Sequence, residues 1–185
     1  MTTPVFALFE TALGRCAIAW GRHGILGVQL PEAHDDQTRA RMRRRFVGAH
    51  EAPPGPEVQQ AIDGIVALLA GQASDLSGVA LDMECEPAFD RRVFAIVRGI
   101  APGATLTYGE VAARLGDRAL ARAVGQALGR NPFSIVVPCH RVLAANGGLG
   151  GFSASGGAVT KRRLLSIEGA RGSAGPGLFD ALPGY

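Results

Sequence analysis

Three polar residues, Cys139, His140 and Arg141, interrupt an apolar run that extends from Ile135 to Ala144. Polar groups in a run of this kind cost stability unless each has a partner. A cysteine attacks as its thiolate, and an ordinary thiol has a pKa of about 8.5, so Cys139 needs a base or a positive field. His140 is adjacent, and Glu168 could orient that histidine. A cysteine, a histidine and a carboxylate together form a relay that activates a nucleophile. On these residues alone, a buried thiol beside a satisfied core histidine remains the alternative.

The basic residues gather in the half of the chain that holds this triplet. Residues 1–85 carry seven basic and ten acidic residues, whereas residues 86–170 carry eleven basic and five acidic ones. Of the 19 basic residues only Lys161 is a lysine. Arginine suits phosphate contacts, although the abundance of alanine, glycine and proline indicates GC-rich coding, which also favours arginine.

Length and composition limit the class of protein. A chain of 185 residues suffices for one large or two small domains. No apolar run reaches the roughly 18 residues of a membrane span, and the first residues do not resemble a signal peptide. We therefore expect a cytoplasmic protein with no membrane partner. The three cysteines form no CxxC pair, and their spacing from His23, His34 and His50 supports no metal site, so we expect no metal.

The first half predicts a small α/β domain over residues 1–85. Short apolar runs around a tight turn at 21–24 indicate an antiparallel meander. Two further segments indicate helices, one because its charges suit the helix dipole and the other because its apolar residues form a helical stripe. The expected strands are 4–9, 15–21, 24–30 and 78–83, the expected helices 35–46 and 57–71, and the expected loop 50–57. A boundary near residues 85–87 follows from the charge shift and Pro87.

The second half predicts an α-rich domain over residues 86–170. The expected helices are 88–100, 107–116, 118–132 and 158–169, with a Thr107 cap, a buried extended segment at 134–138 and a glycine-rich loop at 146–157. The two short helices in the middle indicate a helix-turn-helix. Residues 171–185 are expected to be a flexible tail, in which Leu178 and Phe179 offer a weak contact for a replication clamp.

A helix-turn-helix in a basic half indicates DNA binding. A reactive cysteine beside it then indicates chemistry on a base, which must be flipped out of the duplex to be reached. The segment "ALARAVGQALG" presents small residues and one long cation, Arg122, which could fill the hole that the base leaves. Tyr108 could crowd the phosphate that must rotate.

These motifs resemble those of the O6-alkylguanine-DNA alkyltransferases, also called methylated-DNA–protein-cysteine methyltransferases. "NPFSIVVPCHRV" contains the family's PCHRV signature, "ARAVGQAL" its recognition-helix pattern, "TYGEVA" its tyrosine segment and "KRRLLSIEG" its closing helix. The resemblance covers about residues 86–170, and the first half matches the family's variable N-terminal domain only in outline. It implies a ribonuclease H-like α/β domain followed by a winged-helix-like, helix-turn-helix domain.

The resemblance also implies a reaction. Cys139 would accept the alkyl group of O6-alkylguanine, or of O4-alkylthymine, irreversibly and once per molecule, with no cofactor. His140, held by Glu168, would act as a base through a water molecule, and Asn131 would brace the active-site turn. Tyr108 would press on the target phosphate and later donate a proton to the leaving guanine.

The partner implied is double-stranded DNA, bound in the minor groove by a monomer. Arg122 would replace the flipped base, and the small residues Ala121, Ala123 and Gly125 would allow close approach. The substrate pocket would be formed by Pro138, Val142, Phe152 and Ser153, with the backbone at Cys139 and Val142 reading the guanine edge.

Two features depart from the family's pattern. Phe152 stands where the family usually has tyrosine, and the stretch from there to Lys161 is about two residues longer. Neutral drift and altered lesion specificity are both possible explanations of these departures. Ser153 or Ser155 could supply the polar contact that the tyrosine hydroxyl would have made. A lesion-binding protein that flags damage for another pathway is the alternative function, although relatives of that kind lack the cysteine. A transcription factor that senses alkylation through Cys139 ranks last, because the alanine-rich helix offers few base contacts.

Overall fold

The computed structural model describes residues 3–170. The tail expected at 171–185, with its clamp contact through Leu178 and Phe179, lies outside the described residues.

The first half forms a four-stranded sheet in the order β3-β2-β1-β4. β1 (Val5–Thr11), β2 (Gly14–Gly21) and β3 (Gly24–Gln29) are joined by tight turns and pair antiparallel, as the sequence predicts. β4 (His50–Glu51) adds to the other side of β1 in the parallel direction, so the sheet is mixed. The expected loop at 50–57 therefore begins with a strand, which is too short to show an alternating pattern.

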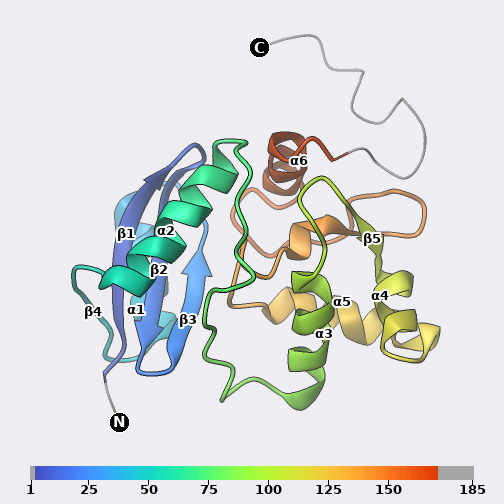
Figure 1. Cartoon of the computed structure of the whole chain (residues 1–185), viewed down its shortest axis with the longest axis horizontal. Coiled ribbons are helices and arrows are strands. Elements are labelled where there is room, and N and C mark those ends of the chain that lie inside the picture. Colours follow the sequence, from blue (N-terminus) through green and yellow to red (C-terminus); the bar gives the residue numbers. More distant parts are fainter. Residues whose placement is uncertain (1–2, 171–185) are drawn as a thin grey trace.

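Helices cover both faces of this sheet. α2 (Pro56–Leu69) lies in front of the strands in Figure 1 and α1 (Asp35–Arg45) behind them. The alternation along the strands explains the two layers. Phe9 and Ile18 point to the core shared with α2, whereas Phe6 and Ala17 point to the core shared with Met42 of α1.

The strand expected at 78–83 is wrong. Only Leu81 makes a bridge, to Ile25 of β3, with hydrogen bonds from Ile25 N to the Ala80 carbonyl and from Asp82 N to the Ile25 carbonyl. The segment touches the outer edge of β3 for one residue and then turns away, with Glu84 N bonded to the Asp82 side chain.

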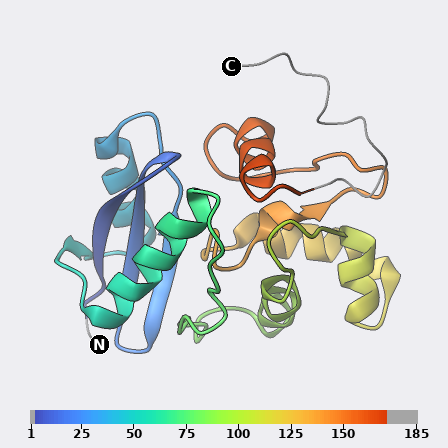
Figure 2. The ribbon, with the colours of Figure 1, turned by 45° about the horizontal axis from the view of Figure 1, so that its top comes forward.

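The second half is mainly helical and lies beside the sheet in Figures 1 and 2. Its elements are α3 (Ala88–Arg98), β5 (Leu106–Thr107), α4 (Tyr108–Arg114), the 3-10 turn η1 (Arg118–Leu120), α5 (Ala121–Arg130), the 3-10 turn η2 (Cys139–Arg141), β6 (Val142–Leu143) and α6 (Ala158–Ile167). The Thr107 cap is confirmed, and it forms a full capping box with Glu110. β5 and β6 pair in parallel, which brings the start of α4 next to the end of η2.

The segment 134–138 is buried as expected, but the extended conformation predicted for it is wrong. It is a turn, in which Val137 N donates to the Phe133 carbonyl at 2.7 Å and Ile135 has a φ of 74°. The side chain of Ile135 packs into the core of the first half, whereas Phe133 and Val137 pack into the core of the second half. The turn therefore ties the two cores together directly before Cys139.

The sheet and the helical half also meet through the backbone. Val28 of β3 donates from its N–H to the Pro132 carbonyl at 2.8 Å, and Val28 bridges Phe133. This contact fixes the segment that leads to the cysteine against the sheet edge. None of the helices between residues 3 and 170 has both the length and the apolar character needed to cross a bilayer.

Candidate active site

Cys139 begins the 3-10 turn η2 directly after Pro138. Its N–H donates to the Val137 carbonyl at 2.8 Å, and the residue is only 9% exposed. Burial raises the pKa of the Cys139 thiol, and the Asn131 amide and the Lys161 ammonium oppose this shift only in part. The resting thiol is therefore protonated, and a reaction through its sulfur needs a proton acceptor nearby.

His140 and Glu168 make the contact that the sequence predicts for them. His140 Nε2 lies 2.9 Å from Glu168 Oε1, and both side chains are almost fully buried. Burial lowers the pKa of His140 even though Glu168 acts to raise it, so the imidazole is neutral near pH 7. Nε2 is engaged with Glu168, which leaves Nδ1 as the nitrogen that can accept a proton.

Arg141 is the second partner of Glu168. Its Nε donates to Glu168 Oε2 at 2.8 Å and its Nη2 to Oε1 at 2.7 Å. Burial acts to raise the pKa of Glu168, but hydrogen bonds from His140 and Arg141 lower it to about 2. Arg141 belongs to the polar triplet, but the sequence alone indicated no role for it.

Asn131 holds the turn between α5 and the cysteine. Its Nδ2 donates to the Val137 carbonyl at 2.8 Å and its Oδ1 accepts from Phe133 N at 2.9 Å. Both bonds are buried, and they close the loop that contains Ile135. These contacts agree with the bracing role that the family resemblance implies for Asn131.

Cys139 faces a cavity of about 710 Å³ between α5, the start of α4 and the glycine-rich loop. The cavity brings together seven of the residues singled out in the sequence: Tyr108, Ala121, Arg122, Gly125, Cys139, Phe152 and Ser153. Four lining residues were not singled out: Gln126, Leu128, Gly129 and Gly151. Gln126, Leu128 and Gly129 share one sequence signal, their helical spacing from Arg122 and Gly125, whereas Gly151 lies in the glycine-rich loop.

Three of the residues predicted for the DNA-binding helix and the substrate pocket do not line this cavity. Ala123 follows Arg122 directly on α5, so its side chain points about 100° away around the helix axis, and Pro138 is buried directly before the cysteine. Val142 is fully buried in β6, and its carbonyl oxygen accepts a hydrogen bond from Lys161 Nζ at 2.6 Å.

Tyr108 is half-buried at the start of α4, with its ring between two glycines. Gly125 of α5 approaches one side, and a Cβ at Gly150 would come within 3.0 Å of the ring on the other. Gly150 also has a φ of 66°, so a larger residue there would be strained and would displace the tyrosine. Burial raises the pKa of the Tyr108 hydroxyl, so this group carries a proton that it can donate.

Lys161 is a further residue of the site that the sequence patterns did not predict. It is fully buried, and its Nζ lies 5.8 Å from the centre of the Tyr108 ring. Burial lowers its pKa from 10.5 to about 8, against the opposing effect of Cys139. The available signal was that Lys161 is the only lysine among 19 basic residues.

Comparison with known proteins agrees with this geometry. The profile of the family described as "6-O-methylguanine DNA methyltransferase, DNA binding domain" matches residues 88–170. The methylated-DNA–protein-cysteine methyltransferase of Methanothermobacter thermautotrophicus is 35% identical over 152 residues, which cover 82% of this chain and 78% of that protein. The protein of the same name from Mycobacterium tuberculosis is 40% identical over 131 residues, which cover 71% and 77%.

A solved structure extends the similarity to the whole fold. The crystal structure of the Mycobacterium tuberculosis OGT protein in complex with DNA has a TM-score of 0.74 and 30% sequence identity, and the match covers 89% of this chain and 92% of that one. The fold combines a mixed sheet with helices, and its site holds a buried cysteine next to a histidine–glutamate pair. These features define the class of DNA methyltransferases that react through a cysteine thiol. The chain belongs to the methylated-DNA–protein-cysteine methyltransferase family.

Proposed function

We propose that this protein repairs DNA by direct reversal, through transfer of an alkyl group from O6-alkylguanine to Cys139. The observation that carries the proposal is that Cys139 faces a cavity on one side and has the His140–Glu168 relay beside it. The relatives named for this reaction match most of the chain. A lesion-binding role without transfer is not favoured, because binding alone needs no relay behind a thiol.

The chemistry follows from the protonation states of the site. His140 Nδ1 takes the thiol proton through a water molecule while the sulfur attacks the alkyl carbon. The new S–C bond forms as the C–O bond breaks, and the electron pair of that bond passes to guanine. Tyr108 donates its proton to the leaving guanine. The product thioether is stable, so each molecule reacts once, and the transfer uses no cofactor.

The DNA-binding surface is proposed on α5. α4, η1 and α5 have the order of a helix-turn-helix, and Arg122 is exposed at the mouth of the cavity. The small side chains of Ala121 and Gly125 beside it suit close approach to a minor groove. Arg122 would then occupy the space that the flipped base leaves in the duplex.

The finer organisation is part of the same proposal. Residues 1–85 would form a ribonuclease H-like domain and residues 86–170 a winged-helix-like domain. One chain carries the nucleophile, the relay and the DNA-binding helix, which supports action as a monomer. Cys16, Cys85 and Cys139 are free thiols, which suits the reducing cytoplasm.

The test is the mass of the intact protein after incubation with a duplex that carries one O6-methylguanine. We expect a gain of one methyl group per protein, located on Cys139 by peptide mapping, and no gain in Cys139→Ala, which still binds the duplex. Cys85→Ala, which removes an exposed thiol, is the matched control and should react fully. A bound lesion without a mass gain, or transfer by Cys139→Ala, would contradict the proposal.

A further inference from the structure

Arg141 is buried, and its guanidinium donates to three acceptor oxygens. Nε and Nη2 hold both oxygens of Glu168, and Nη1 donates to the carbonyl of Ile100, just beyond the end of α3. Its side chain is 6% exposed, and that of Glu168 is 3% exposed. A bidentate contact between a guanidinium and a carboxylate, like this one, fixes the carboxylate in position and compensates its charge.

The charge matters because Glu168 also faces His140. A buried carboxylate opposite an imidazole stabilises the imidazolium, and a protonated histidine cannot accept the thiol proton. The other charged groups that act on His140 are Lys161 from α6 and Arg141 itself, and the titratable Cys139 is its neighbour in the chain. Arg141 and Lys161 both disfavour a second positive charge there. Of these two cations, only Arg141 bonds directly to Glu168.

We propose that Arg141 is a positioning residue that compensates the charge of Glu168 and thereby keeps His140 an unprotonated base. The relay is then a group of four: Arg141 neutralises Glu168, Glu168 orients His140, and His140 accepts the proton of Cys139. The inference rests on the proposed function, and it goes beyond that function by assigning Arg141 control over the pH at which the base works.

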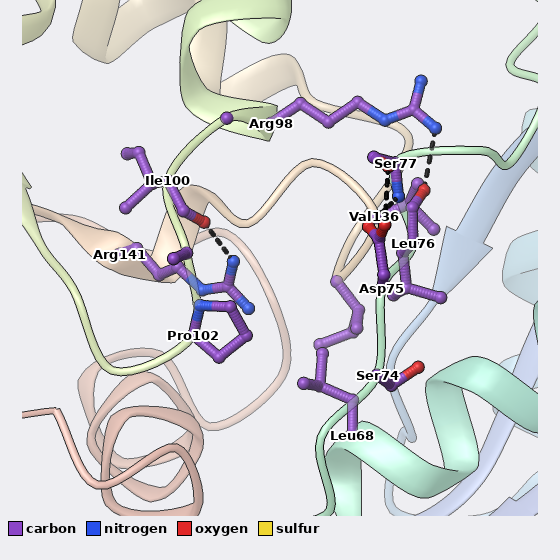
Figure 3. Close-up of a pocket in the computed structure, with 13 residues that line it drawn as sticks. Leu68, Ser74, Asp75, Leu76, Ser77, Arg98, Ile100, Pro102, Val136 and Arg141 are labelled. Carbon is purple, nitrogen blue, oxygen red and sulfur yellow. Dashed lines mark hydrogen bonds between the residues drawn. The ribbon is translucent and has the colours of Figure 1, made fainter.

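Arg141 also forms part of the wall of a second cavity, of about 330 Å³, between the two halves of the protein. Figure 3 shows the guanidinium of Arg141 at the Ile100 carbonyl on one side of this cavity and the segment 74–77 on the other. The cavity lies next to the position that the guanidinium would leave in a truncated variant. A small cation supplied from solution therefore has a route to that position.

The first experiment is a titration of His140 followed by the imidazole nitrogen shifts in NMR. It compares the wild type with two variants. Arg141→Met keeps a long side chain without the charge, and Arg141→Lys keeps the charge without the bidentate contact to the carboxylate. We expect the pKa of His140 to rise by at least about one unit in Arg141→Met and by less in Arg141→Lys. An unchanged His140 titration in Arg141→Lys and Arg141→Met would overturn the proposal. This readout does not need alkyl transfer, so it separates the proposal from the proposed function.

The second experiment is the pH profile of the single-turnover transfer rate. Because the base must be unprotonated, a higher His140 pKa moves the acidic limb of the profile to higher pH. Below both pKa values, the rate falls about tenfold for each unit of the shift. Arg141→Met combined with Glu168→Gln removes both charges and should move the limb back. Added guanidinium ion should do the same for Arg141→Ala. A loss of rate by the same factor at every pH, with no return of the limb, would show a purely structural role and overturn the proposal.

Discussion

Lys161 Nζ donates to the carbonyl oxygen of Val142 at 2.6 Å in the interior of the protein. Lys161 lies in α6, and Glu168 follows at the end of the same helix, two turns later. Leu164 and Leu165, which lie between them, are buried, so one face of α6 supplies both a cation and the relay carboxylate. The closing helix is therefore part of the active site as well as of the core.

The buried ammonium predicts a dependence of stability on pH. The folded protein releases the Lys161 proton near pH 8, whereas an unfolded lysine holds it to about pH 10.4. Between these values the unfolded state binds more protons, so the stability contributed by Lys161 rises with pH. We expect the stability of the wild type relative to Lys161→Met to increase by up to about 3 kcal/mol from pH 7 to pH 10.4. Urea unfolding of both proteins at several pH values measures it, and parallel curves would contradict the assignment.

Asn131 is expected to be a large single contributor to the stability of the active-site turn. Asn131→Ala leaves Phe133 N unpaired in the interior and removes one of the two hydrogen bonds to the Val137 carbonyl, at a cost of about 2 kcal/mol. Asn146→Ala is the matched control, because Asn146 makes a similar bond to Gly148 N at an exposed position. Chemical denaturation should show a change below about 1 kcal/mol for that control. Equal losses in the two variants would show that Asn131 does not brace the turn.

Sequence patterns predict the helices and strands whose apolar residues recur at a regular spacing. They do not predict the elements whose conformation depends on a single tertiary contact. The meander and the helices are recognised because their apolar residues recur with a period of two or about 3.6. The turn at 134–138 contains no glycine or proline before Pro138, and it exists because the Asn131 side chain and two separate cores hold it. β4 has two residues and depends on a parallel partner far away in the sequence. In the site, the PCHRV motif indicates the nucleophile, but the buried position of Lys161 depends on how α6 packs.

At Ile135 we expect the glycine variant to be more stable than the alanine variant, which reverses the usual order of these two substitutions. A φ of 74° is strained for any residue with a Cβ, by about 1–2 kcal/mol. Ile135→Ala removes the buried side chain and keeps the strain, whereas Ile135→Gly removes both. We expect Ile135→Gly to be more stable than Ile135→Ala by up to about 1 kcal/mol in denaturant unfolding.

Val136 provides the matched comparison for this effect. It is equally buried, and its φ is not positive. Val136→Gly should therefore be less stable than Val136→Ala by about 0.5–1 kcal/mol. The same order at both positions would mean that the turn relaxes when Ile135 is truncated, and that its left-handed conformation depends on the isoleucine itself.

Arg122 should matter for duplex DNA and not for the chemical step. Its side chain is exposed at the mouth of the cavity, so Arg122→Ala removes no buried contact and should leave stability unchanged. If Arg122 fills the space of the flipped base, its loss makes flipping less favourable by about 1–2 kcal/mol, a factor of about 5 to 30 in the duplex reaction. Free O6-alkylguanine needs no flipping and should react at the wild-type rate.

The measurement for Arg122 is the ratio of the single-turnover rates on duplex and free base. Arg114→Ala is the control, because it removes the same charge from α4 without touching the cavity. It should weaken binding to DNA in a salt-dependent way and leave the duplex rate at saturating protein unchanged. Arg122→Ala should lower that saturating rate, since the base it stabilises outside the duplex is the reactive one. Equal losses on both substrates would place Arg122 in the chemistry of transfer and remove it from base flipping.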